Sequence, residues 1–124
     1  MITHIQGRLV ELNPAYAVIE CNGVGYMLNI SLNTYSKLGD SESCKLYSHL
    51  AVKEDSHTLY GFFDKLERKI FRMLISVSGV GASTARVILS SMQSSEIRDA
   101  IVSEDVALIK SVKGIGIKTA QRII

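Results

Sequence analysis

Two stretches of the sequence are near copies of each other: SVSGVGASTARVIL, residues 76–89, and SVKGIGIKTAQRII, residues 111–124. They align without gaps at an offset of 35 residues, from Gly79 to Gly114, and seven of the fourteen positions are identical. Each copy places two glycines around one aliphatic residue, after Ser-Val and before Thr-Ala. A match of this kind at a fixed offset indicates that a structural unit has been duplicated within the chain.

Each copy predicts a helix, a tight turn and a second helix. Glycine has no Cβ, so the glycine pair permits positive φ and a close approach of another backbone. We expect the aliphatic residue between the glycines, Val80 or Ile115, to pack between the two helices and hold the turn rigid. Ala85 and Ala120 are small enough to let those helices cross closely. The second helix begins with N–H groups that lack partners within the helix and carry partial positive charge, which suits a phosphate group.

Other glycine-rich loops fit this pattern less well. A dinucleotide-binding fingerprint needs a third glycine and a preceding strand, whereas Thr84 and Thr119 stand at the third position here and a helix precedes. A Walker loop needs Gly-Lys-Ser/Thr at a spacing that neither copy has. A pair of structural turns without any ligand stays open as an alternative, because helical hairpins are common.

The charge distribution favours a polyanionic ligand for the half that carries the duplication. The net charge of +2 divides into −2 for residues 1–63, with four Lys/Arg against six Asp/Glu, and +4 for residues 64–124, with ten against six. A basic half in an otherwise balanced chain is typical of proteins that bind polyanions.

The duplicated unit resembles the helix-hairpin-helix motif of proteins that grip duplex DNA without reading its sequence. Backbone N–H groups and Lys or Arg side chains that contact phosphates fix a protein's position but carry no base information. For Lys110 and Lys113, a phosphate contact and a merely solvated position both stay open. The predicted DNA-binding residues are Gly79, Val80, Gly81, Ser83, Thr84 and Arg86 in the first copy, and Gly114, Ile115, Gly116, Lys118, Thr119 and Arg122 in the second.

The first half of the chain has the alternating pattern of short strands. Two β-branched or aromatic runs flank Asn22-Gly23, which predicts a hairpin with a type I′ turn. The run 31–39 opens with Ser and closes with Gly, which predicts a short helix. Two further strand-like runs flank the polar turn 53–56. Five strands with one helical turn between them predict a small antiparallel barrel, with the OB fold as the leading candidate.

The second half has the three- and four-residue spacing of amphipathic helices. Asp64 and Glu67 predict a capping box at the start of the first helix, and Ser95 and Ser103 are candidate N-caps of later helices. We therefore expect an α+β chain of two domains: a five-stranded OB-type β-barrel over residues 1–63, and an all-α domain with tandem helix-hairpin-helix motifs over residues 64–124.

Several function classes lack any support in the sequence. Cys21 and Cys44 stand alone, with no Cys-x-x-Cys motif, and are expected to be reduced strand residues rather than a disulfide or metal site. The histidines, at positions 4, 49 and 57, form no set with carboxylates or cysteines, and no pairing of a nucleophile with a base is present. We expect no cofactor, no metal and no catalysis. No apolar run approaches the ~18 residues that span a bilayer, and no signal peptide is present, so we expect a cytoplasmic protein.

The order of motifs along the whole chain resembles the RuvA family, the DNA-binding subunits of the bacterial Holliday junction branch-migration complex. The resemblance rests on five stretches in the family's order: MITHIQGRLVE (1–11), NGVGY (22–26), HLAVKEDSHTLYGF (49–62), ISVSGVGASTARVILS (75–90) and VKGIGIKTAQRII (112–124).

The resemblance implies a structure-selective role without catalysis. It implies a homotetramer on which a four-way DNA junction lies, with each subunit's hairpins holding the backbone of duplex arms. It also gives the turn carboxylates Glu54 and Asp55 a role, as an acidic pin at the centre of the junction that keeps strands apart. By composition alone these two residues form an ordinary solvated turn. The implied partners are the RuvB motor, which would supply the ATP-dependent activity, and the RuvC resolvase, in a nucleoid-associated setting.

The sequence also departs from the family pattern. Ala82-Ser83 stands where relatives commonly have Pro-Lys, Ile117 where they often have Lys, and Lys113 where proline is common. We expect these changes to reduce affinity or to increase its dependence on Lys118 and Arg122. Relatives continue into a third domain that binds RuvB. We therefore expect the 124-residue sequence to bind junctions without productive stimulation of RuvB.

Two alternatives of other classes remain at this stage. A fragment of a DNA-repair enzyme could use the same motif, but such an enzyme would need a nucleophile-and-base site downstream of the hairpin. A protein-interaction module would use the hairpins only for packing, and its nucleic-acid affinity would not depend on Gly116 or Lys118.

Overall fold

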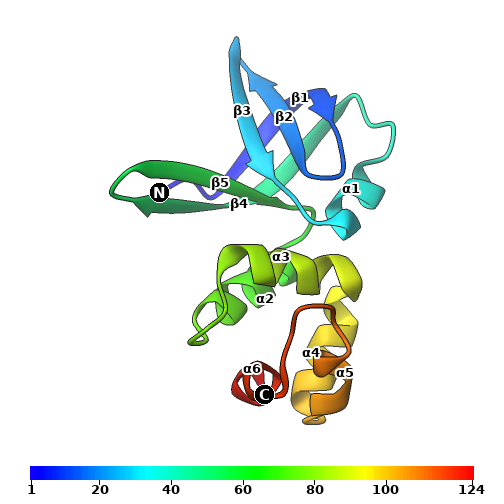
Figure 1. The fold of residues 1–124 in the computed structure, drawn as a ribbon. Coiled ribbons are helices and arrows are strands. Elements are labelled where there is room, and N and C mark those ends of the chain that lie inside the picture. Colours follow the sequence, from blue (N-terminus) through cyan, green and yellow to red (C-terminus); the bar gives the residue numbers. More distant parts are fainter. The chain divides into compact units, whose positions relative to one another are not determined.

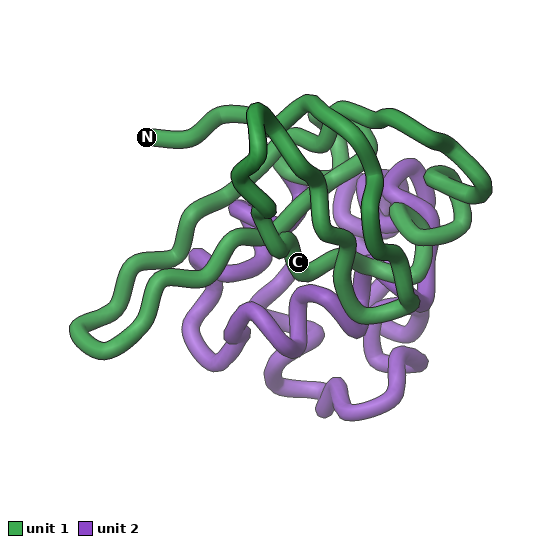
Figure 2. The backbone as a smooth tube through the Cα atoms, turned by 90° about the horizontal axis from the view of Figure 1, so that it is seen from above, with its two compact units in different colours: residues 1–68 green, residues 69–124 purple.

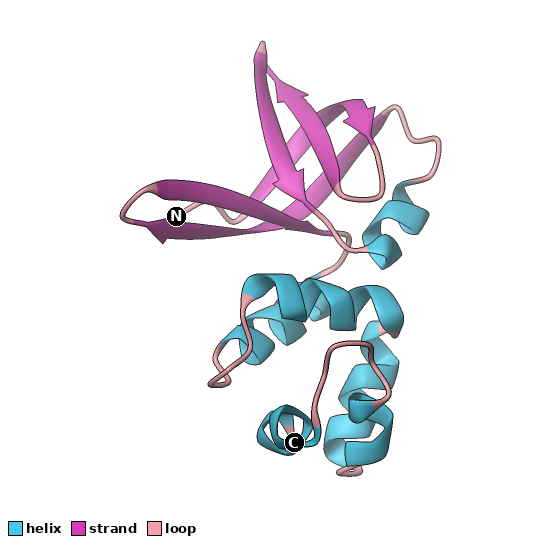
Figure 3. Ribbon diagram, viewed as in Figure 1, coloured by secondary structure: helices cyan, strands magenta, loops and turns pink.

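The N-terminal half of the chain forms a closed barrel of five strands in the order β1-β2-β3-β5-β4 (Figures 1 and 3). The computed structural model describes all residues, 1–124. Every neighbouring pair is antiparallel except β3 and β5, which pair in parallel and close the barrel. The predicted five-stranded OB-type barrel is confirmed. Its elements are β1 (His4–Leu12), β2 (Tyr16–Cys21), β3 (Val24–Asn29), α1 (Leu32–Leu38), β4 (Ser43–Lys53) and β5 (Ser56–Phe62).

Local sequence signals account for the turns of the barrel. Asn22 and Gly23 join β2 to β3 with φ of 50° and 84°, as the predicted type I′ turn requires. The hydroxyl of Ser31 accepts a hydrogen bond from the Thr34 backbone N–H and caps α1, and Gly39 ends that helix with φ of 51°. The predicted short helix over 31–39 is therefore confirmed.

The interior of the barrel is apolar and closely filled. Alternate residues of the strands point inward, as the period of two dictates. Gly61 lies where the packing leaves no space, because a Cβ there would lie 3.0 Å from side-chain atoms of Leu28 and Leu46. The buried residues of this core are Ile5, Ala17, Ile19, Leu28, Ile30, Leu38 and Leu46.

The C-terminal half is entirely helical, as predicted. Its buried side chains follow the spacing of three and four residues that brings one face of each helix inward. The helices are α2 (Lys65–Ile75), α3 (Ala82–Ser91), α4 (Ser94–Val102), α5 (Val106–Lys110) and α6 (Ile117–Ile123). The larger fully buried side chains are Phe71, Leu74, Ile88, Leu89, Ile97 and Ile109.

Two of the predicted helix caps are wrong. Gln93, with extended φ and ψ of −65° and 152°, caps α4 and forms a capping box with Glu96. Ser95 lies two positions after Gln93, inside the helix, and therefore cannot adopt the extended geometry of an N-cap. Ser103 is the C-cap of α4 rather than an N-cap, because Glu104 adopts a positive φ of 56° and delays the next helix. Asp105 then caps α5 by accepting from the Leu108 N–H.

The chain divides into two compact units, Met1–Arg68 and Lys69–Ile124, with the boundary inside α2 (Figure 2). The first turn of α2 belongs to the barrel unit. Asp64 Oδ1 accepts from the Glu67 N–H at 2.9 Å, as an N-cap does. The division at residues 63 and 64 into a barrel domain and a DNA-binding domain stays a prediction.

Glu67 does not complete the predicted capping box, because its carboxylate binds elsewhere. It accepts a hydrogen bond from Ser31 Oγ at 2.8 Å and another from Thr34 Oγ1. The side chain is 3% exposed, so these hydroxyls replace water around a buried carboxylate and tie α1 to the first turn of α2. Burial raises the pKa of Glu67 above its ordinary value, and the two hydroxyl hydrogen bonds oppose that rise only in part.

The raised pKa of Glu67 predicts a pH-dependent contribution to stability. Because the folded-state pKa exceeds the unfolded one, the stabilising effect is complete below about pH 4.3 and is lost as pH rises through the folded value. We expect the free energy of unfolding of the unmodified protein, relative to Glu67→Gln, to fall between pH 4 and pH 8. Urea unfolding across that range measures the difference, with Glu104→Gln as the exposed control. A difference that stays constant or increases with pH would contradict the assignment.

Candidate nucleic-acid interface

The two copies of the duplicated motif have the same backbone hydrogen bonds. In the first turn, Val77 N donates to Leu74 O at 3.0 Å and Val80 N donates to Val77 O at 3.0 Å. In the second, the residues 35 positions later form the same pair of bonds, at 3.2 Å and 3.1 Å. The serine that opens each turn donates its hydroxyl to the carbonyl three residues earlier. The duplication in sequence is therefore also a duplication of the turn's geometry.

The two glycines of each pair have different structural roles. The first has positive φ, 88° at Gly79 and 90° at Gly114, a conformation that residues with a Cβ rarely adopt. The second has ordinary extended φ, −91° at Gly81 and −84° at Gly116, and a Cβ built on either would meet nothing within 4 Å. The fold therefore requires the first glycine but leaves open space at the second.

The residue between the glycines packs inward as predicted. Val80 is 5% exposed and Ile115 is 7% exposed, so both turns are anchored by an aliphatic side chain. Ala85 and Ala120 are fully buried in the helices that follow, where a larger side chain would push the helices apart.

Both second helices begin without a side-chain cap. Gly81 precedes α3 and Gly116 precedes α6, and neither glycine has a side chain that could accept from the first-turn N–H groups. Such N–H groups keep their donor capacity and their partial positive charge. Together with the open space at the second glycine, each turn offers room and donors to an incoming anionic backbone.

The polar residues predicted for DNA binding lie on these second helices. Ser83 and Lys118 are exposed, whereas Thr84, Arg86 and Thr119 are half-buried. Lys110 and Lys113 are also exposed, so the structure leaves both of their possible roles open.

Arg122 connects the two copies. Its Nη1 donates to the Ser78 carbonyl at 3.5 Å, and a Cβ on Gly79 would lie 3.3 Å from the same nitrogen. The helix of the second copy is thus next to the turn of the first. The sequence predicted Arg122 as a phosphate contact but did not predict this proximity, because nothing in the duplicated pattern specifies which side of one copy faces the other.

The acidic pair lies at the tip of a long hairpin in the barrel unit. Lys53 pairs with Ser56, so Glu54 and Asp55 form a two-residue turn, and both are exposed. β4 pairs with β1 only as far as Tyr47, so its later residues pair with β5 alone. The distal part is a two-stranded ribbon that extends from the barrel (Figures 1 and 3). Neither carboxylate is in an ion pair.

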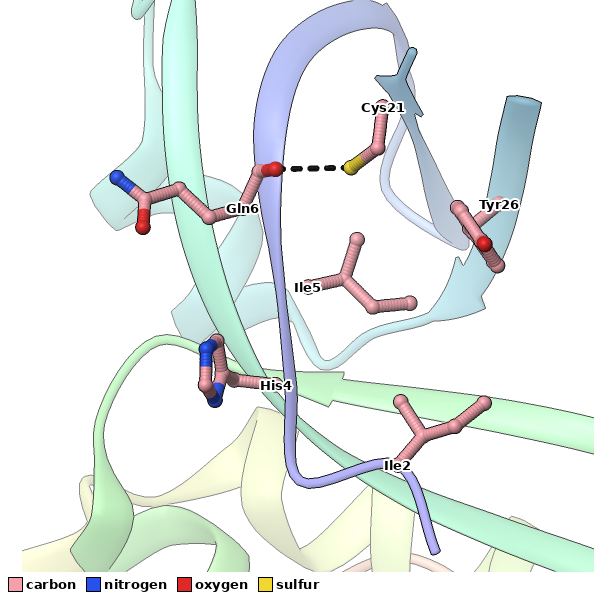
Figure 4. Close-up of a pocket in the computed structure, with 6 residues that line it drawn as sticks. All are labelled: Ile2, His4, Ile5, Gln6, Cys21 and Tyr26. Atoms are coloured by element: carbon pink, nitrogen blue, oxygen red, sulfur yellow. Dashed lines mark hydrogen bonds between the residues drawn. The ribbon is translucent and has the colours of Figure 1, made fainter. Parts of the chain in front are cut away.

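The cysteines are free thiols, as predicted. Cys21 lines a pocket of about 300 Å³ together with residues of β1 and Tyr26, and its thiol donates to the Gln6 carbonyl at 2.8 Å (Figure 4). Burial raises the pKa of the Cys44 thiol, and the neighbouring Cys21 adds to that effect. No group of three or more His, Cys, Asp or Glu is arranged to hold a metal ion. None of the helices is both long and apolar enough to span a membrane.

The contrast between the two glycines of a pair predicts opposite effects of the same substitution. Gly114→Ser places a Cβ at positive φ, and we expect it to lower the free energy of unfolding by about 1–2 kcal/mol. Gly116→Ser introduces a good N-cap residue at ordinary φ, and we expect no change or a gain of a few tenths of a kcal/mol. Chemical denaturation of both variants measures the difference. Equal destabilisation by the two serines would show that the turn's backbone requirement has been misassigned.

The chain matches two family models and a set of curated relatives. Residues 1–61 match the RuvA N terminal domain, and residues 71–124 match the SAM-like helix-hairpin-helix tandem. Relatives named Holliday junction branch migration complex subunit RuvA are 67% identical in Christiangramia forsetii, 59% in Flavobacterium psychrophilum and 57% in Bacteroides thetaiotaomicron, each over all 124 residues. The chain spans 64%, 64% and 62% of the lengths of these relatives. The barrel, the tandem hairpins and these relatives agree: residues 1–61 form a RuvA N-terminal domain and residues 71–124 a helix-hairpin-helix tandem.

Proposed function

We propose that this chain binds four-way DNA junctions, without sequence preference, as a non-catalytic DNA-binding subunit of a branch-migration complex in recombination and repair. The relatives' names, which refer to the Holliday junction and to a complex subunit, support this role. The observation that carries the proposal is the repeated turn, in which the second glycine has open space that the fold itself does not use. A backbone that approaches closely from outside explains why glycine stands there twice.

Each hairpin would hold one stretch of DNA backbone. The phosphates would accept hydrogen bonds from the first-turn N–H groups of α3 and α6, with Ser83, Thr84 and Arg86 assisting in the first copy and Lys118, Thr119 and Arg122 in the second. Ser83 and Ile117 offer no positive charge, so Lys118 and Arg122 would supply most of the side-chain attraction. Because Arg122 lies next to the turn at Ser78, one guanidinium could serve both copies.

Glu54 and Asp55 would act electrostatically rather than as catalytic acids or bases. Four subunits around a junction would bring together about eight carboxylates near the crossover phosphates, and like charges a few ångströms apart repel by ~1 kcal/mol per pair in water. Repulsion at the tip would disfavour an uninterrupted duplex and keep the exchanging strands apart.

The assembly that this mechanism requires is a homotetramer with fourfold symmetry, acting in the bacterial cytoplasm, where the chromosome lies. ATP-dependent strand movement would belong to the RuvB motor and cleavage to the RuvC resolvase.

Junction binding is tested by a gel-shift titration of a four-way junction against a linear duplex of matched length and sequence. We expect preference for the junction, and a log–log decrease of affinity with salt of ~0.9 per phosphate neutralised. Gly116→Ser should weaken binding to both DNAs, because its hydroxyl occupies the N–H groups that phosphate would use, while stability is maintained. A flat salt dependence would contradict phosphate binding.

The remaining alternatives give different outcomes in the same assay. A protein-interaction module would show no DNA affinity that depends on Gly116 or Lys118. A fragment of a repair enzyme would bind damaged linear duplex at least as well as the junction.

The role of the acidic tip is tested by Glu54→Gln combined with Asp55→Asn. These substitutions keep the turn's shape and remove both charges, so we expect binding to linear duplex to strengthen and the preference for the junction to fall several-fold. Glu11→Gln combined with Asp40→Asn removes the same charge from exposed positions away from the tip and serves as control. If both pairs change the preference equally, net charge alone explains the effect.

A further inference from the structure

Three cationic side chains surround one aromatic ring in the barrel unit. The Lys45 ammonium lies 5.2 Å from the centre of the Tyr47 ring, the Lys65 ammonium 5.6 Å and the Arg68 guanidinium carbon 5.5 Å. They come from two elements, β4 and the first turn of α2. Each contact with the ring is individually favourable, but three like charges so close together repel one another.

These cations border a pocket of about 260 Å³ that has no acidic wall. Its lining residues are Thr3, His4, Lys45, Tyr47, Lys65 and Arg68. The ammonium, guanidinium, imidazole and phenol groups of this lining are all hydrogen-bond donors. The volume is several times the ~30 Å³ that one water molecule occupies, so an oxyanion fits with room for solvent.

No carboxylate of the chain neutralises the cluster. The ion pairs of the chain are Arg8–Glu20, Lys37–Asp64 and Arg98–Asp99. The acidic residues nearest in sequence to Lys65 are already bound elsewhere: Asp64 caps α2, and Glu67 accepts from two hydroxyls of the α1 region. The positive charge of the pocket is therefore available to an external anion.

Arg68 is held in place for such a role. Its Nη1 donates to the Thr3 carbonyl at 2.7 Å and to the Ser48 carbonyl at 3.4 Å, which anchors the guanidinium between the N-terminus and β4. A guanidinium anchored on one side loses little conformational freedom when its other donors bind a phosphate.

We propose that the pocket around Tyr47 is an oxyanion site that takes a phosphate group of the DNA backbone, separate from the two hairpins. The proposal rests on the proposed function for the identity of the ligand. Tyr47 lies on β4, the strand that leads to the acidic tip, six residues before Lys53, or roughly 20 Å along the strand. A phosphate would thus be attracted at the base of the β4–β5 hairpin and repelled at its end.

The first experiment detects the anion site without DNA. Inorganic phosphate is titrated into the protein while the ring signals of its three histidines are followed by NMR. We expect the signals of His4, in the pocket, to shift, while those of His57, on β5 near the acidic tip, stay in place. In Lys45→Gln combined with Lys65→Gln, the His4 shift should be lost. These lysines are exposed, so the double variant avoids the structural contacts of Arg68.

The second experiment identifies the source of the phosphate. The salt dependence of duplex and junction binding is compared for the pocket double variant and for Lys69→Gln combined with Arg98→Gln, which removes the same charge from exposed positions outside the pocket. We expect the slope to fall by ~0.9 per bound subunit in the pocket variant alone.

Each remaining outcome overturns a defined part of the proposal. No His4 shift with phosphate overturns the oxyanion site. A His4 shift with an unchanged DNA slope overturns the assignment to DNA. If, in addition, sedimentation gives a lower mass for the pocket variant than for the unmodified protein, the anion that binds in the pocket is a carboxylate from a second copy of this chain. Absence of DNA binding by the unmodified protein overturns the proposed function and, with it, the DNA assignment, whereas the phosphate titration still decides whether the anion site exists.

Discussion

The backbone at Gly79 and Gly114 adopts φ near 90°, and the geometry of both hairpins depends on those two residues. Positive φ reverses the chain within a few residues, so the next side chain, Val80 or Ile115, points into the helical core. The reversal also leaves the following helix to begin at the surface, with a second glycine as its N-cap. Burial of the aliphatic residue and exposure of the N–H groups are thus two consequences of one backbone constraint.

The β4–β5 hairpin of the barrel unit has acidic side chains at one end and basic side chains at the other. The end of the β4–β5 hairpin carries two unpaired carboxylates, and its base carries three cations around Tyr47 without a carboxylate partner. Neither group stabilises the barrel through an internal ion pair. Groups that have no internal ion pair and carry opposite charges at the two ends of one ribbon suit a ligand that is itself highly charged. The chemistry that we propose for this protein is accordingly electrostatic positioning of DNA.

The buried carboxylate of Glu67 shows how a correct local pattern can lead to a wrong interpretation. Asp64 and Glu67 have the spacing of a capping box, and Asp64 does cap the helix. Glu67 instead points toward Ser31 and Thr34, which are more than thirty residues away in the chain. Local spacing specifies which side chains could meet on one helix, but the competing hydroxyls belong to another element. The misassigned caps have local causes: Gln93 rather than Ser95 caps α4, and a positive φ at Glu104 moves the start of the next helix beyond Ser103.

The duplicated motif, the Asn22-Gly23 hairpin and the alternating strands are local patterns, and each was sufficient to predict its own turn or element. Glycine pairs, cap residues and periodicity act over a few residues, so their physical meaning can be read directly from the chain. The contact of Arg122 with the turn at Ser78, the hydrogen bonds of the buried Glu67 carboxylate and the contact of Lys65 with the Tyr47 ring join residues that are 18 to 44 positions apart. Such contacts depend on how whole elements pack, and packing directions are specified by the sum of many weak side-chain contacts rather than by any short pattern. The sequence was therefore enough to predict the kind of fold and the two hairpins. The cation cluster at Tyr47 follows only from the tertiary structure, because closure of the barrel brings β4 beside the first turn of α2.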